Sequence, residues 1–245
     1  DELHTMGAVP VFEAIRRRLG EKTKVALLTG TLVILPDSAV ASAQKISNEE
    51  KASCIVKPIE GTNHSEVVFG GSNKHKVGII TKIFALGEIN ILVGTKSLLG
   101  EGWDSPNINS LILASFVGSF MLSNQMRGRA IRIDKKNPEK VSNIWHLVTV
   151  EPSYIFTENK LQQATSRLSY DKDTLVSCDY DILKRRFDSF MGPTYTGESI
   201  ESGIERITAI SPPYNKKGIE RINEDMLRLS ADRRGVLEKW KSISR

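Results

Sequence analysis

Short apolar runs of strand length alternate with amphipathic stretches of helix length over the first 150 residues, and this alternation constrains the fold more than any other feature. The run at 89–94 is a continuous apolar stretch, which is typical of a strand buried on both faces of a sheet, the run at 24–28 indicates a short buried strand, and the run at 110–115 indicates another strand. The stretch at 76–87 carries apolar residues three and four positions apart, which is the spacing of a helix. This order predicts an α/β fold in which helices cover both faces of a parallel sheet.

The same reading along the chain gives a set of expected elements. Helices are expected at 11–19, from 37 or 38 to about 51, at 76–87 and near 125. Strands are expected at 24–28, 32–36, 54–59, 67–69, 89–94, 110–115 and 144–150. Asp37 or Ser38 is expected to cap the second of these helices. Because a doubly wound sheet carries its working loops at the carboxyl ends of its strands, a site is expected after residues 94 and 115.

The character of the chain changes after residue 150. The segment 151–245 contains fewer strand-like runs, more charge and several Gly-Pro and Pro-Pro breaks. Near its end, apolar residues recur at spacings of three, four or seven: Ile219, Ile222, Met226, Leu229, Val236, Trp240 and Ile243. This pattern predicts one long amphipathic helix, or two with a break near 232–235, packed on the chain's own core rather than on a partner. We therefore expect two domains, 1–150 and a mostly helical extension over 151–245.

Composition excludes several classes of protein. A chain of 245 residues with 40% hydrophobic and 26% charged residues is neither disordered nor fibrous. No apolar run approaches the ~20 residues that span a bilayer, and no secretory signal is visible, so we expect no membrane partner and a cytoplasmic location. Cys54 and Cys178 lack any paired spacing, and the four histidines form no metal-binding motif, so no metal site is expected. The chain begins without Met, and we interpret it as a segment of a longer protein.

One short span concentrates the positive charge. Arg127, Arg129 and Arg132 follow Gln125 closely, and residues 121–140 contain six basic against two acidic side chains. That span has a net charge of +4, whereas the whole chain has +5. Planar guanidiniums hold two oxygens each and stay charged at any working pH, so closely spaced arginines suit a polyphosphate better than a solvated helix face does.

A second candidate is the loop 95–106, which follows a predicted strand. Gly102 makes the backbone flexible just before Asp104, so a carboxylate is presented near the end of the strand. Carboxylates at such strand ends commonly bind ribose hydroxyls or orient a neighbouring arginine. Thr95 and Lys96, at the mouth of the strand, can donate hydrogen bonds to a phosphate.

No self-contained catalytic motif is present in the sequence. The letters Gly94-Thr95-Lys96-Ser97 resemble the end of a phosphate-binding P-loop, but both glycines that the P-loop requires are missing. A Rossmann glycine motif is absent, and no nucleophile, base and orienting acid stand out as a set. A self-sufficient small-molecule enzyme is therefore disfavoured.

Two segments resemble known helicase motifs. Thr95–Pro106 (TKSLLGEGWDSP) resembles motif V and Gln125–Arg132 (QMRGRAIR) resembles motif VI of the superfamily 2 helicases, in their DEAD/DEAH-box and type III restriction branch. They lie about 20 residues apart, in the expected order, each joined to the expected strand. The resemblance is to the second RecA-like domain of these motors. It implies a three-layer RecA-like parallel sheet, of the P-loop NTPase type, for residues up to about 150.

The resemblance also implies an ATP site shared between two lobes. In such motors ATP with Mg²⁺ lies between two RecA-like lobes, and the first lobe supplies the P-loop and the metal-binding carboxylates. The second lobe closes over the γ-phosphate. Arg129 and Arg132 match the arginine fingers of motif VI, and Gln125 matches the glutamine on the γ-phosphate side. An inserted arginine of this kind accelerates phosphoryl transfer by about 10³ to 10⁵.

The remaining matches concern binding. Gly102 and Asp104 match the motif V residues near the ribose, and Arg129 joins them in nucleotide binding. Thr95 matches the threonine that contacts the nucleic-acid backbone, with Lys96 beside it.

The sequence departs from the family at two places. A glycine precedes the last arginine of motif VI in many relatives, and Ile131 stands there in this chain. Family members begin this lobe with a strand and motif IV, whereas this sequence opens almost at a helix. The letters of Asp1–His4 fit a DExH box and Thr29–Thr31 resembles motif III, but no apolar strand precedes them, so we reject a first-lobe interpretation.

The sequence thus predicts the C-terminal motor lobe of an ATP-dependent nucleic-acid helicase or translocase. Its expected partners are nucleic acid, with DNA favoured over RNA, and the N-terminal RecA-like lobe of the same parent chain. Without a P-loop, the segment alone is expected to be inactive. The alternative is a RecA-like scaffold that binds nucleic acid or protein without catalysis.

Overall fold

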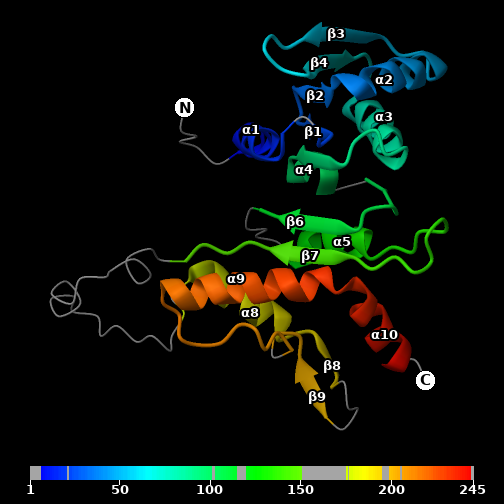
Figure 1. The fold of residues 1–245 in the computed structure, drawn as a ribbon. Coiled ribbons are helices and arrows are strands. Elements are labelled where there is room, and N and C mark those ends of the chain that lie inside the picture. The colour runs from blue at the N-terminus through cyan, green and yellow to red at the C-terminus, as the bar shows by residue number, and fades with distance from the viewer. Residues whose placement is uncertain are drawn as a thin grey trace, which may run out of the picture. The chain divides into compact units, whose positions relative to one another are not determined.

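Figure 1 shows the computed structural model of the chain, which describes residues 7–20, 22–100, 103–114, 120–150, 175, 177–194, 199–204 and 206–243. The chain folds as two compact units. Unit 1 comprises Asp1–Ile108 and Met121–Asp134, and unit 2 comprises Asn109–Phe120 and Lys135–Arg245. The domain boundary that we expect at residue 150 stays a prediction, since this grouping reports only which parts of the chain pack together.

Unit 1 is a mixed α/β unit with helices on both faces of one sheet. Its helices are α1 (Ala8–Leu19), α2 (Asp37–Glu49), α3 (Asn73–Ala85), α4 (Lys96–Gly100) and nearly all of α5 (Phe120–Ala130). Its strands are β1 (Val25–Leu28), β2 (Val33–Pro36), β3 (Cys54–Pro58), β4 (His64–Phe69) and β5 (Ile91–Gly94). Helix α2 begins where expected, but its N-cap is Pro36, and the carboxylate of Asp37 accepts a hydrogen bond from Ser65 Oγ at 2.7 Å instead of capping the helix.

The sheet of unit 1 has the strand order β3-β4-β2-β1-β5, and its strands are mostly antiparallel. Only β1 and β5 run parallel, whereas the pairs β1–β2, β2–β4 and β3–β4 are antiparallel. The expectation of a parallel sheet is therefore wrong for three of the four pairs. The physical reason is the length of the connections, because a parallel crossover needs about a dozen residues. Between β1 and β2 the chain turns within Thr29–Leu32, where Thr29 N donates to Leu32 O at 2.8 Å, and so short a turn permits only a hairpin.

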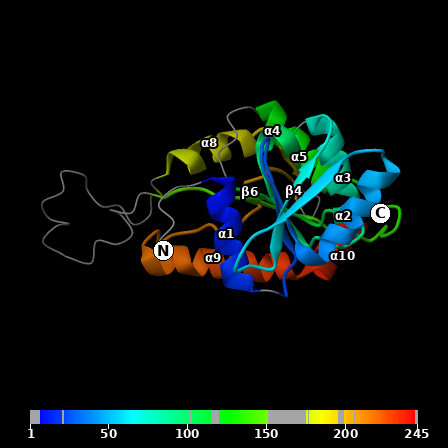
Figure 2. The same ribbon diagram turned by 90° about the horizontal axis from the view of Figure 1, so that it is seen from above.

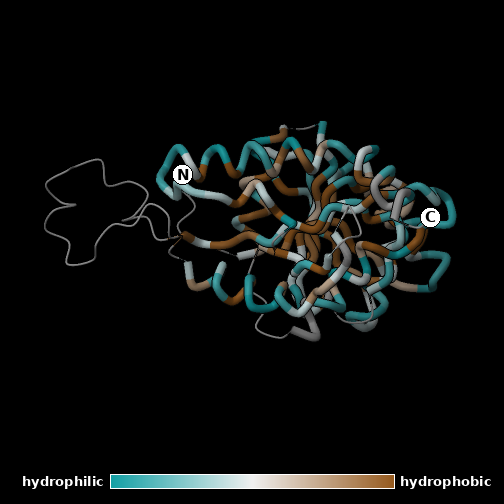
Figure 3. The backbone as a smooth tube through the Cα atoms, turned by 90° about the horizontal axis from the view of Figure 1, so that it is seen from below, coloured by the Kyte–Doolittle hydropathy of each residue, from teal (hydrophilic) through white to brown (hydrophobic). Residues whose placement is uncertain are grey.

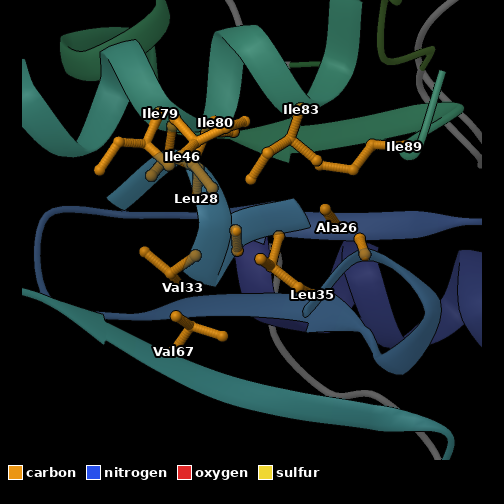
Figure 4. Close-up of a cluster of buried hydrophobic side chains, with 12 residues drawn as sticks. Ala26, Leu28, Val33, Leu35, Ile46, Val67, Ile79, Ile80, Ile83 and Ile89 are labelled. Carbon is orange, nitrogen blue, oxygen red and sulfur yellow. The ribbon is translucent and has the colours of Figure 1, made fainter. Parts of the chain in front are cut away.

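One face of this sheet carries the larger hydrophobic core of unit 1. Residues from β1, β2 and β4 interleave there with the apolar faces of α2 and α3 (Figure 4). The buried members are Ala26, Leu28, Val33, Leu35, Ala39, Ala43, Ile46, Val67, Ile79, Ile80, Ile83 and Ile89. Burying a Leu or Ile side chain contributes roughly 1.5–3 kcal/mol, so α3 is held firmly against the sheet.

Helix α1 covers the opposite face of the same sheet. Its Phe12 packs with Val25, Leu27 and Ile34, and Figure 2 shows α1 on one side of the strands and α2 and α3 on the other. Successive side chains of a strand point to opposite faces, so Val25 and Leu27 face α1 while the residues between and after them face α3. All four residues of β1 are consequently buried, as the continuous apolar run predicts.

Unit 2 contains the other parallel pair of strands, β6 (Ser110–Leu113) and β7 (Asn143–His146). Its other described elements are α8 (Cys178–Phe187), β8 (Met191–Pro193), β9 (Ile200–Ser202), α9 (Lys216–Ala231) and α10 (Arg233–Ile243). Strands β8 and β9 form an antiparallel hairpin. The described residues beyond 150 are thus partly helical and partly a short hairpin.

The two terminal helices follow the expected apolar pattern only in part. Helix α9 ends at Ala231 and α10 begins at Arg233, so the chain breaks where the spacing places a break. Figure 3 shows hydrophobic and hydrophilic residues mixed along these helices, and Ile222 is buried. Leu229, however, is 46% exposed, so it does not belong to the packed stripe.

Polar contacts hold the junction of α9 and α10 to the strands of unit 2. Asn143 Nδ2 donates to Ser230 O at 2.8 Å. Arg233 Nη1 donates to Val141 O at 2.6 Å and to Asn109 O at 3.0 Å. The junction is therefore anchored by Ser230 before the break and by Arg233 after it.

Among the described residues, no helix combines the length and the apolar character that crossing a bilayer requires. The expected compartment stays a prediction.

Candidate functional site

The candidate site begins where β5 ends. Gly94 lies opposite Leu28 in the parallel pair β1–β5, and Thr95 N donates to Leu28 O at 3.4 Å. Helix α4 starts directly afterwards, with Thr95 O accepting from the backbone N–H of Leu99 at 3.1 Å. Thr95 is half-buried and Lys96 is exposed. Both residues therefore lie at the carboxyl edge of the sheet, where a ligand can reach the Lys96 amine.

The turn from Trp103 to Ile108 docks on α3. Trp103 is 7% exposed, and its Nε1 donates to Thr81 Oγ1 at 2.7 Å. Farther along the turn, Ser105 Oγ donates to Asn107 Oδ1 at 2.6 Å. Asn107 Nδ2 in turn donates to Phe84 O, in the last turn of α3, at 3.5 Å. The turn is thus attached to the helix at both ends.

Two arginines from the end of α5 meet this turn. Arg132 Nη1 lies 2.6 Å from the Asp104 carboxylate, and both side chains are more than half exposed. Arg129 Nη1 donates to the carbonyl oxygen of Trp103. The structure therefore brings together three of the residues that the sequence singles out, namely Arg129, Arg132 and Asp104, within unit 1.

The hydrogen bonding of Arg129 is incomplete in this arrangement. Its Nε is buried and has no hydrogen-bond partner among the described residues. Leaving a buried donor unsatisfied costs roughly 1–3 kcal/mol. Within the described part of the chain, the arrangement therefore leaves one guanidinium donor of Arg129 without an acceptor, whereas Arg132 is paired with Asp104.

The other predicted residues are less closely joined to this cluster. Gln125 is exposed on α5, one helical turn before Arg129, and no hydrogen bond or ion pair joins it to Arg132 or Asp104. Residues four apart share a helix face, so Gln125 lies on the same side of α5 as Arg129. Gly102 falls outside the described residues. Thr95 and Lys96 lie at the end of β5, and the structure shows no contact of theirs with the two arginines.

Sequence reasoning missed the residues that support the site. Trp103 and Thr81 fix the position of the turn, and the sequence signal for them was a large aromatic residue inside a loop. A further cation also went unnoticed: Lys76 Nζ donates to Gly30 O at 2.7 Å, at the carboxyl end of β1. Burial lowers the pKa of Lys76 from its ordinary value.

Comparisons of the chain with models of protein families, with curated proteins and with solved structures found no match. Within the described part of the chain, no group of three or more His, Cys, Asp or Glu side chains is arranged to hold a metal ion.

Proposed function

We propose that this chain contains the second, RecA-like motor lobe of an ATP-dependent helicase or translocase that acts on nucleic acid, with DNA favoured over RNA. The observation that carries the proposal is the pair of contacts from Asp104 to Arg132 and from Trp103 to Arg129. These contacts join the two segments that resemble motifs V and VI. A chance match of two short patterns gives no reason for the two segments to meet.

The architecture of unit 1 is compatible with this proposal. Helices cover both faces of its sheet, and β1 and β5 form a parallel pair at one edge of the sheet, where the candidate site begins after β5. The antiparallel strands β2, β3 and β4 depart from the parallel RecA-like pattern. In the proposed lobe they form an extension on one side of β1, away from β5.

The proposed chemistry uses the two arginines at the end of α5. ATP is held between this lobe and a first lobe, and Mg²⁺ bound by the first lobe neutralises phosphate charge. Arg129 and Arg132 present fixed positive charge to the γ-phosphate, where negative charge develops during transfer, and Gln125 lines the same side. Asp104 orients Arg132 and accepts hydrogen bonds from the ribose hydroxyls.

The carboxyl edge of the sheet is the proposed contact with nucleic acid. Thr95 and Lys96 donate to backbone phosphates there, which fixes the position of the lobe without reading sequence. Binding of single strands and duplexes by the 245-residue chain is then expected to weaken steeply with salt. Lys96→Ala reduces the slope of log K against log salt by about 1. Binding that does not respond to salt would contradict a phosphate-contacting surface.

The catalytic part of the proposal is tested by ATP turnover of the longer parent protein, measured with and without DNA or RNA. Arg129→Ala is expected to lower turnover by about 10³-fold or more, because the inserted guanidinium is lost. Arg228→Ala serves as the matched control, since Arg228 is a 74% exposed arginine of α9 in unit 2. Unchanged turnover in Arg129→Ala would refute the arginine-finger assignment.

One observation favours the alternative, a scaffold without catalysis. Arg132 and Asp104 already satisfy each other within the chain, as they would in a purely structural ion pair. Native sequence upstream of Asp1 discriminates between the two functions. A P-loop and a strand-borne DExH box there favour the motor, and their absence favours the scaffold.

A further inference from the structure

We propose that Trp103 and Thr81 are positioning residues. They fix the turn 103–108 on α3, and the fixed turn then holds Arg129 and Arg132. This inference rests on the proposed function, since it concerns how the two arginines are aimed. Neither Trp103 nor Thr81 belongs to the residues that would touch ATP or nucleic acid.

The bond between Trp103 and Thr81 has a defined direction. The Trp103 indole N–H can only donate, and it donates to Thr81 Oγ1 at 2.7 Å. The Thr81 hydroxyl in turn donates its hydrogen to Val77 O at 2.7 Å, one turn earlier in α3. The hydroxyl hydrogen is therefore directed toward the helix backbone, and an oxygen lone pair faces the indole. The indole N–H and the Thr81 hydroxyl are therefore each fixed in one orientation by their hydrogen bonds.

Helix α3 supplies a rigid base for this bond. Ile79, Ile80 and Ile83 lie on its inner face and have no solvent exposure. The Trp103 ring also packs against Phe84 of the same helix, with the ring centroids 6.5 Å apart and the planes tilted by 42°. A displacement of the turn away from α3 would therefore break the hydrogen bond and the ring contact together.

Both arginines depend on atoms next to this anchor. Arg129 donates to the carbonyl oxygen of Trp103 itself, and Arg132 pairs with the carboxylate of Asp104, the next residue. The second contact is an exposed ion pair and is weak on its own, so it depends on Asp104 being held in place by the anchored turn. Loss of the anchor on α3 is expected to misplace both guanidiniums at once.

The test replaces the Thr81 hydroxyl in the longer parent protein. Thr81→Val removes the acceptor with little change in volume, and Thr81→Ser keeps the hydroxyl as the matched control. We expect Thr81→Val to lower kcat for ATP by about tenfold to a hundredfold, because small misplacements of catalytic groups have effects of that size. KM for ATP changes little, and Thr81→Ser retains most of the turnover.

A second readout needs no activity and uses the 245-residue chain itself. The chain contains three tryptophans, and the indole N–H signal of Trp103 in an NMR spectrum is identified by its disappearance in Trp103→Phe. We expect this signal and the Arg129 Nε–H signal to shift in Thr81→Val and to stay near their wild-type positions in Thr81→Ser. The spectrum also establishes that each variant is folded.

The outcomes separate the inference from the proposed function. If Arg129→Ala loses turnover while Thr81→Val keeps its kcat, the positioning role is refuted and the motor function stands. If Arg129→Ala keeps its turnover, the arginine-finger assignment is refuted, and the NMR signals then decide the structural link. If the longer parent protein shows no ATP turnover at all, the proposed motor function itself is refuted. An Arg129 signal that is unmoved in folded Thr81→Val refutes the inference, and a shift upholds the link from α3 to Arg129.

Discussion

The two faces of the sheet in unit 1 are built differently. The face under α2 and α3 is a large apolar core, and beside it a fully buried polar side chain of α2, Ser47, donates to Ala43 O at 2.7 Å. The face under α1 is smaller and contains a buried histidine, His64, whose Nδ1 has no hydrogen-bond partner in the described structure. The candidate site is attached to the first face, through α3. The site is therefore attached to the more apolar side, and the other side contains a buried, titratable histidine.

Truncation within the larger core should have the largest effect. Ile80→Ala is expected to destabilise the chain by roughly 2–5 kcal/mol, because it removes a fully buried side chain and leaves a cavity beside α3. The free energy of unfolding in denaturant measures the effect. Ile55→Ala is the control, since Ile55 is 56% exposed and should change stability by about 0.5 kcal/mol or less. Similar losses in the two variants would contradict the assignment of this face as the main core.

The face under α1 should lose stability in acid. His64 Nε2 lies 3.1 Å from Val25 O, and burial is the main cause that lowers the pKa of His64 from its ordinary value of 6.5. The unfolded chain then binds the proton more readily than the folded chain. The stabilising contribution is therefore complete above pH 6.5 and is lost progressively as the pH falls toward the lowered pKa.

This dependence can be measured against a variant that does not titrate. His64→Gln keeps a donor for the Val25 carbonyl but has no titratable group. Relative to that variant, the wild-type chain is expected to lose up to about 1.4 kcal/mol of unfolding free energy per pH unit below the ordinary pKa of histidine. Parallel stability curves for the two chains between pH 7 and pH 5 would show that His64 does not titrate on unfolding.

A smaller and opposite effect is expected at Gly128 of α5, a helix none of whose described side chains belongs to either core cluster. An added Cβ at Gly128 would meet no atom within 4 Å, so alanine fits there. Gly128→Ala is expected to stabilise the chain by about 1 kcal/mol, since alanine is the better helix former. If a phosphate approaches the backbone at Gly128 in the parent protein, the same change lowers ATP turnover. Stabilisation with full turnover would show that no such approach occurs.

Sequence patterns predicted the type of most elements in unit 1 but not their pairing. The apolar run at 24–28 corresponds to β1 (Val25–Leu28), and the helical spacing at 76–87 corresponds to α3 (Asn73–Ala85). The N-cap of α3, Ser72, whose side chain accepts from His75 N, was missed because the helix was expected to begin only at residue 76. Spacing of apolar residues identifies the buried face of an element and leaves its ends poorly defined.

For the candidate site, too, the sequence predicted some of the residues that meet but not what holds them together. Asp104 and Arg132 were chosen for their chemistry and because their segments resemble two helicase motifs. In the structure, Arg132 Nη1 lies 2.6 Å from the Asp104 carboxylate. Gln125 and Lys96 were chosen on the same grounds, and the structure shows no contact that joins them to that pair. The supports of the site, Trp103 with Thr81, could not be found from spacing, because their bond joins an ordinary helix residue to a distant loop.

The sequence by itself determined where helices and strands form, because burial on one face imposes a local period of two or about 3.6 residues. It also determined that arginines and a carboxylate occur in two short segments. Only the tertiary structure decided that β2, β3 and β4 run antiparallel, since direction follows from how each connection closes. It alone decided that Trp103 lies on α3, because that contact depends on the packing of the whole unit rather than on neighbouring residues.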